Sequence, residues 1–173
     1  YWDDVREFLL LLDKQWPLVR DAENKRDHVV HRDTALRALA KRLKTAPRDG
    51  HVIAAGSTGS IPATADLLDA ISRLPKGAVV LPGLDLTLDD ASWNNLDAGH
   101  PQFGMKQLLD RMAVARGDVK IWGGADRMAT PREALLRETL RPAPTTDAWR
   151  ALAESGTDAI AKGLPGLSLV EAA

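Results

Sequence analysis

The sequence predicts an α/β fold, with a small parallel sheet that carries helices on both faces and a helical segment before it. Two short apolar runs bounded by glycine, HVIAAG from His51 and GAVVLPG from Gly77, have the composition of strands buried on both faces. Residues 62–74 between them carry apolar side chains at helical spacing. The three segments together indicate a β–α–β unit.

Composition limits the classes of function. The chain has 173 residues, 45% of them hydrophobic, which is enough for one domain with a buried core. Its formal net charge of −1 gives no overall attraction to nucleic acid or to an anionic membrane. Without cysteine, disulfides, thiolate metal sites and a cysteine nucleophile are excluded. The longest apolar run, FLLLL, is too short to cross a bilayer, so we expect a soluble protein. The lack of cysteine fits a reducing compartment, and we expect the cytoplasm.

Three parts are expected along the chain. Residues 1–48 have helical periodicity and are expected to form two helices. Pro17 opens or interrupts the first helix, and the APRDG segment ends the second. Residues 49–125 form the α/β core unit. Residues 126–173 form a helical connection and the start of a further strand, LSLVEAA. Because the chain begins at Tyr1 without a methionine, we expect it to be a piece of a longer protein.

The core unit continues beyond Asp85 with shorter elements. We expect a helix at about 88–96, another at 105–114 and a third strand, DVKIW, at 118–122. Helices are then expected at 132–140 and at about 148–161, separated by the proline-rich segment RPAPTTD.

The loop GSTGS, between the first strand and its helix, is the first candidate site. Backbone amides before a helix can hold an anion, yet no lysine between His51 and Pro75 completes a nucleotide-binding loop, and the G-x-S-x-G pattern of a nucleophile is absent. A structural turn is the simpler interpretation, with Ser60 capping the helix and Pro62 in its first turn. Contacts to DNA phosphate from Ser57, Thr58 and Ser60 remain the alternative.

Other candidates are explained more simply by structure. His28 and His31 have the spacing of two metal ligands on a helix, but two histidines are half of a zinc site. His100 is expected to lie in a loop that positions Phe103. The five tryptophans are expected to pack in the core or between elements. Arginines 127, 132, 137 and 141 have glutamates interleaved among them, which favours a surface with salt bridges over a phosphate site. We therefore expect no catalytic, cofactor-binding or metal-ligating residue.

A longer resemblance covers most of the chain from His51 onward. VIAAGSTGSIPATADLLDAISRLPKGAVVLPGLD, followed by SW, HPQFGMKQLLDRM, LRPAPTTDAW and LSLVEAA, resembles the alphaproteobacterial type of the AddB family. AddB is a subunit of the AddAB helicase–nuclease of double-strand break repair. The resemblance implies an internal fragment of the helicase-like region, a degenerate P-loop fold of superfamily 1, without the nuclease carboxylates or the iron–sulfur ligands.

The same resemblance implies that the motor is inactive. An active superfamily 1 helicase has an acidic pair at the end of the corresponding strand, where alignment on Pro62 puts Ala55 and Gly56. Neither residue can bind Mg²⁺ or activate water. The next strand ends in PGLD, where an active helicase has G-D-x-x-Q.

The function expected is therefore non-catalytic: a scaffold and DNA-channel element of a repair helicase–nuclease subunit, docked against the catalytic AddA-type subunit. Two alternatives come from other classes. One is a stand-alone α/β enzyme that holds a phosphorylated small molecule on the GSTGS amides, for which Asp85 is the only acid–base group at that edge. The other is a protein–protein docking module without DNA contact.

Overall fold

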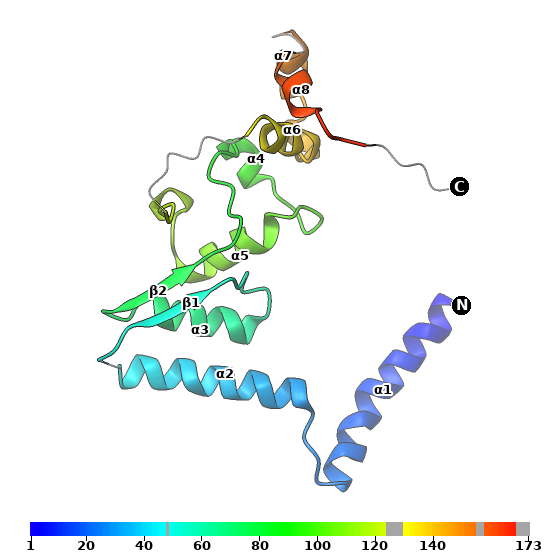
Figure 1. Cartoon of the computed structure of the whole chain (residues 1–173). Coiled ribbons are helices and arrows are strands. Elements are labelled where there is room, and N and C mark those ends of the chain that lie inside the picture. The colour runs from blue at the N-terminus through cyan, green and yellow to red at the C-terminus, as the bar shows by residue number, and fades with distance from the viewer. Residues whose placement is uncertain (48, 124–129, 155–157, 169–173) are drawn as a thin grey trace. The chain divides into compact units, whose positions relative to one another are not determined.

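The computed structural model describes residues 1–47, 49–123, 130–154 and 158–168 (Figure 1). The chain divides into two compact units, each taken by itself below. One comprises Tyr1–Ile53 with Ile61–Ala78, and the other Ala54–Ser60 with Val79–Ala173.

The described residues are mostly helical, with one small parallel sheet, so the mixed α/β class expected from the sequence is confirmed. The elements are α1 (Trp2–Ala22), α2 (His28–Thr45), β1 (Val52–Ala55), α3 (Pro62–Ser72), β2 (Gly77–Val80), α4 (Asp90–Asn94), α5 (Phe103–Met112), η1 (Arg116–Asp118), α6 (Pro131–Thr139), η2 (Ala143–Thr145), α7 (Ala148–Glu154) and α8 (Asp158–Gly163).

Helix α1 runs through Pro17 without a break, so the prediction that this proline opens or interrupts the helix was wrong. None of its residues is buried, and Trp2 is 81% exposed. Its apolar side chains, Phe8 and Leu12 among them, therefore contribute little to the core of the described chain.

Helices α2 and α3 pack side by side and form the core of the first unit. Asp27 begins α2 by accepting hydrogen bonds from the amides of Val29 and Val30, which satisfies two of the free donors at the helix start. An ion pair of 2.8 Å between Lys44 Nζ and Asp69 Oδ2 joins the two helices. The buried residues on the two helices are Ala40, Leu43, Ala63, Ala65, Leu68, Ala70 and Ile71.

The two strands pair in parallel, as the β–α–β pattern predicts (Figure 1). The amide of Val52 donates to the carbonyl of Lys76, and the amide of Gly56 donates to the carbonyl of Val80. Both bonds have the same offset in sequence, which fixes a single parallel register. Pro62 lies in the first turn of α3, also as predicted.

The expected burial of both sheet faces is wrong for these strands. Exposure alternates along β1, where Ile53 is 64% exposed while its neighbours are half-buried. Such alternation is typical of a sheet with one covered face. The sequence pattern misled because an apolar run is also compatible with a strand whose second face is left open.

The second unit contains α4 and α5. Asp89 caps α4 through the Ser92 amide, and α5 ends at Ala113, whose backbone is left-handed with φ of 52°. The predicted helices at 88–96 and 105–114 are thus present with slightly different ends. Four side chains of α5 are buried, those of Met105, Leu108, Leu109 and Met112.

The predicted third strand at 118–122 is absent. The chain forms the single 3-10 turn η1 and then continues without regular structure, and Ile121 and Trp122 are exposed. Arg116 anchors this segment through its side chain, which stacks on Trp93 and pairs with Asp90. The alternating apolar pattern therefore finds no strand partner among the described residues.

Helix α6 begins at a capping motif that is visible in the sequence, and it packs against α8. Thr130 and Glu133 form a reciprocal capping box at the start of α6, with Pro131 in its first turn. Helix α6 packs against α8, where a Cβ on Gly163 would lie 2.8 Å from Leu135 Cβ. The predicted helix at 148–161 corresponds to α7 and α8, on either side of residues 155–157. Residues 169–173 of the predicted terminal strand lie outside the described residues.

Candidate functional site

The GSTGS loop connects β1 to α3 and follows the carboxyl end of β1. Gly56 and Gly59 have φ of 79° and 63°, in the left-handed region that glycine adopts without strain. A Cβ on Gly59 would lie 2.7 Å from Leu108 Cδ1, so the loop backbone packs closely against α5. Two glycines are therefore needed for the turn itself.

The three hydroxyl residues of this loop differ in exposure. Ser57 is half-buried, and its Oγ accepts a hydrogen bond of 3.3 Å from the Gly59 amide. Thr58 and Ser60 are exposed. The prediction that Ser60 caps α3 was wrong, because Ile61 is the N-cap residue and makes no side-chain cap hydrogen bond. Ser57 therefore stabilises the loop, while Thr58 and Ser60 present hydroxyl groups to solvent.

The residues at the end of β1 carry no ionisable side chain. Ala55 is the last residue of the strand and Gly56 opens the loop, and both are exposed. A methyl group and a hydrogen atom offer no ligand to a divalent cation and no base to a water molecule. This end of the strand can approach an anion only through backbone amides and hydroxyl groups.

Asp85 is the acid that the sequence placed beyond the second strand, and its carboxylate is fully engaged. Oδ1 accepts hydrogen bonds from the amide and hydroxyl of Thr87 and from the amide of Leu88. Oδ2 accepts one of 3.0 Å from Arg137 Nε. Burial by itself raises the pKa of Asp85, but the bonds from Thr87 and Arg137 outweigh it and hold that pKa below its ordinary value. Asp85 is therefore ionised at neutral pH and anchors the turn.

Gln102 fastens the same turn from the start of α5. Its Oε1 accepts from the Asp85 amide at 3.0 Å, and its Nε2 donates to the Gly83 carbonyl at 2.9 Å. His100, which the sequence placed in a loop near Phe103, accepts a hydrogen bond from the Gln102 amide through Nδ1. These contacts are structural and leave His100 no partner of a catalytic kind among the described residues.

The predicted arginine group also serves structure. Arg141 binds Glu138 and Asp89 at 2.8 Å and donates to the hydroxyl of Ser92, which is fully buried. Arg132 donates to the carbonyl of Pro165. With Arg137 held by Asp85, three of the four arginines have partners within the protein, and Arg141 pairs with Glu138, one of the interleaved glutamates. Arg127 lies outside the described residues.

The remaining candidate residues are not arranged as a catalytic or metal-binding site in the described part of the chain. His28 and His31 are exposed on α2. Among the described residues, no three His, Asp or Glu side chains are grouped closely enough to hold a metal ion. None of the five tryptophans is buried and Trp122 is 80% exposed, so the expected packing in the core is not found. Trp93 instead packs between elements, the other expected place, because it stacks on Arg116 of η1.

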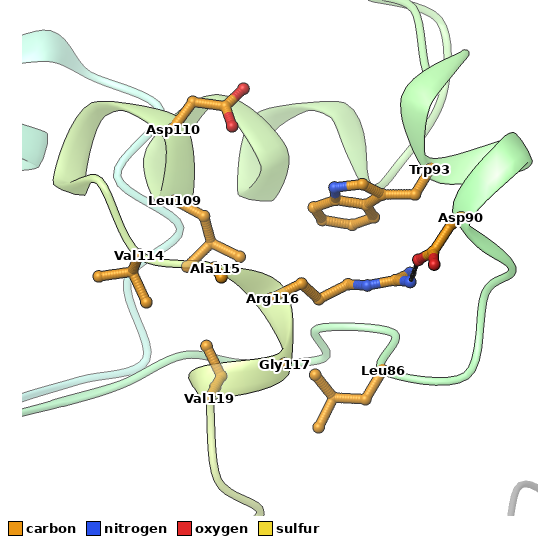
Figure 2. A pocket seen from close by; sticks show the side chains of 10 residues that line it. All are labelled: Leu86, Asp90, Trp93, Leu109, Asp110, Val114, Ala115, Arg116, Gly117 and Val119. Carbon is orange, nitrogen blue, oxygen red and sulfur yellow. Dashed lines mark hydrogen bonds and ion pairs between the residues drawn. The ribbon is translucent and has the colours of Figure 1, made fainter.

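One pocket was not foreseen from the sequence. It measures about 690 Å³ and is formed by α4, the end of α5, η1 and the turn after β2 (Figure 2). The guanidinium carbon of Arg116 lies 4.7 Å from the centre of the Trp93 ring, and its Nη2 lies 2.6 Å from Asp90 Oδ1. The residues that line the pocket are Leu86, Asp90, Trp93, Leu109, Asp110, Val114, Ala115, Arg116, Gly117 and Val119.

No sequence signal marks this pocket, because its walls come from two separate stretches of the chain, residues 86–93 and 109–119. The contact of Arg116 with Trp93 joins two residues that have a whole helix, α5, between them in the chain. Arg116 Nη1 is buried and has no hydrogen-bond partner in the described part of the chain, which costs about 1–3 kcal/mol for such a group. Stacking on Trp93 and the ion pair with Asp90 offset that cost.

Comparison with known proteins gives no relative for this chain. No protein-family model, no curated protein and no solved structure matches it. Within the described ranges, no helix combines the length and the apolar character needed to cross a membrane.

Proposed function

We propose that this chain is a non-catalytic, helicase-like segment of an AddB-type subunit of a cytoplasmic double-strand break repair helicase–nuclease. It acts as a scaffold, contacts the DNA backbone, and docks against the catalytic AddA-type subunit. The proposal rests on the resemblance of residues 51–173 and treats the β1–α3–β2 unit as a degenerate P-loop fold. Catalysis by ATP hydrolysis and DNA cleavage belongs to the rest of the complex.

The observation that carries the non-catalytic part is the chemistry at the strand ends. An active motor needs a carboxylate at the end of β1 to hold Mg²⁺, and this position has Ala55 and Gly56. The nearest acid along the chain after β2, Asp85, is bound by Arg137 and by the turn that it anchors. These features favour a role in binding over a role in catalysis.

Contact with DNA is assigned to the exposed hydroxyls of Thr58 and Ser60 and to the amides beside them. Neutral hydroxyl and amide donors bind phosphate oxygens without providing sequence recognition. Since the net charge of the chain is −1, we expect weak affinity that depends on local contacts. The alternative of a phosphorylated small molecule at this loop is disfavoured because Asp85 is not available as an acid or base.

Fluorescence anisotropy with labelled forked DNA tests this proposal. The chain should bind at low salt and lose affinity as salt rises. Replacing both Thr58 and Ser60 with alanine should raise the dissociation constant about five- to thirtyfold, from the loss of two hydrogen bonds. A control with alanine at Thr45 and Ser72, two exposed hydroxyl residues of α2 and α3, should bind like the unmodified chain.

Two results would contradict the proposal. Equal DNA affinity of the loop variant and the control would remove the assigned contacts. Tight, Mg²⁺-dependent binding of ATP in calorimetry would show an active nucleotide site. If DNA binding is absent at micromolar protein while the AddA-type subunit still co-elutes in size-exclusion chromatography, only the docking role remains.

A further inference from the structure

The pocket between α4, α5 and η1 is lined by both apolar and charged side chains. Leu109 is 2% exposed at its base, and Leu86, Val114 and Val119 are half-buried around it. Figure 2 shows the Arg116 side chain lying under the Trp93 ring, with its guanidinium directed to Asp90. The apolar side chains of this mixed lining, together with the stacked pair, can accept an aliphatic or aromatic side chain.

The charge of the pocket is negative. Three charged side chains line it, those of Asp90, Asp110 and Arg116. Arg116 is neutralised by Asp90 at 2.6 Å, while the exposed Asp110 forms no ion pair among the described residues. One carboxylate is therefore left over at the rim, which repels phosphate and attracts a cation.

We infer that this pocket binds an apolar side chain of a partner protein that has a lysine or arginine beside it in sequence. The apolar side chain enters between Leu109, Val114 and Val119, and the cation approaches Asp110. The inference rests on the docking part of the proposed function and assigns it a place and a chemistry. The Nη1 atom of Arg116 is buried, so we do not expect it to contact the partner.

The apolar part of the pocket and the carboxylate at its rim contribute differently to binding. Burial of one leucine or phenylalanine side chain supplies most of the affinity, about 1.5–3 kcal/mol. An exposed pair of opposite charges adds little affinity, about 0.2–1 kcal/mol, but it selects against acidic segments and nucleic acid. The expected affinity for a short peptide is therefore low, and the measurement must detect millimolar binding.

Nuclear magnetic resonance of the ¹⁵N-labelled chain provides this measurement. The probe is a capped peptide that contains Lys-Leu-Phe-Lys, with two comparison peptides in which either the lysines become glutamates or Leu-Phe becomes Ala-Ala. The first peptide should shift the amide signals of Leu109, Val114, Gly117 and Val119, and both comparison peptides should bind more weakly.

A charge reversal tests the role of the rim. The variant Asp110→Lys should raise the dissociation constant of the lysine peptide about threefold to tenfold. The matched control is Ala151→Lys, which adds a positive charge at an exposed position of α7 that does not line the pocket. Its affinity should stay within about twofold of the unmodified chain.

Three outcomes would overturn the inference: equal binding of the lysine and glutamate peptides, shifts confined to other residues, or larger shifts of the pocket amides with a DNA oligonucleotide than with peptide. The proposed function is judged separately, by DNA anisotropy and by co-elution with the AddA-type subunit. If co-elution persists unchanged with Asp110→Lys, the docking function stands and the pocket is the wrong site for it.

Discussion

Nε of Arg137 lies 3.0 Å from Oδ2 of Asp85, and this ion pair joins α6 to the turn after β2. The two side chains are 17% and 22% exposed, so water screens their attraction only partly. The pair spans 52 residues and fastens the turn to a helix much later in the chain.

Removal of this arginine should destabilise the second unit. Arg137→Ala leaves the Asp85 carboxylate partly buried without its charged partner, and we expect the free energy of unfolding to fall by about 1–3 kcal/mol. Urea denaturation followed by circular dichroism measures the change. Arg150→Ala, at an exposed position of α7, should alter stability by less than about 0.5 kcal/mol. Similar losses in both variants would show that the ion pair contributes nothing.

Acid should destabilise the protein through Asp85 and Asp69. Burial raises the pKa of each carboxyl, but hydrogen bonds from Thr87 to Asp85 and from Lys44 to Asp69 outweigh it, so both pKa values lie below the ordinary 3.8. Unfolding then takes up protons. The stabilising contribution is complete above the ordinary pKa and is lost as the pH falls through the lower folded-state pKa.

The thermal unfolding temperature, followed by circular dichroism from about pH 6 to pH 2, measures this dependence. The variant Asp85→Asn keeps an acceptor for the Thr87 amide and cannot titrate, so its unfolding temperature should decline less steeply with acid. A profile as steep as that of the unmodified chain would exclude Asp85 as a source of the acid sensitivity.

Gly77, the first residue of β2, should not tolerate a side chain. A Cβ at this position would lie 1.9 Å from the backbone oxygen of Ile71 and 2.9 Å from Leu74 Cβ. Because the backbone oxygen cannot move aside without distorting the end of α3, Gly77→Ala should cost about 3 kcal/mol. Chemical denaturation of the purified variant measures this loss.

Gly104 provides the matched control, since no heavy atom lies within 4 Å of a Cβ there. It lies inside α5, where alanine is the better helix former, so Gly104→Ala should stabilise the protein by about 0.5–1 kcal/mol. If Gly77→Ala were as stable as Gly104→Ala, the close approach of β2 to α3 would be incorrect.

The β1–α3–β2 unit was predictable because its signals are local. Pro62 in the first turn and the spacing of Ala65, Leu68 and Ile71 define α3, and all three apolar residues are buried. The strand predicted at 118–122 failed for the opposite reason. Its apolar alternation is also local, but a strand needs a partner, and the sheet of the described residues contains only β1 and β2.

The candidate site was predictable only in part. The sequence identified the turn and the lack of an acid at Ala55 and Gly56, because those features are read residue by residue. It assigned the cap of α3 to Ser60, whereas Ser57 makes the hydrogen bond that stabilises the loop. The engagement of Asp85 and the pocket beside Trp93 arise from contacts between distant segments, which no local pattern encodes.

The open face of β1 also has a consequence for handling the protein. Parallel strands are normally covered on both sides, yet Ile53 is exposed and, in the described chain, the pair has no third strand. Unpaired main-chain groups beside an apolar face are a template on which other molecules can add strands. At high concentration this edge of the sheet should therefore be a site at which aggregation begins.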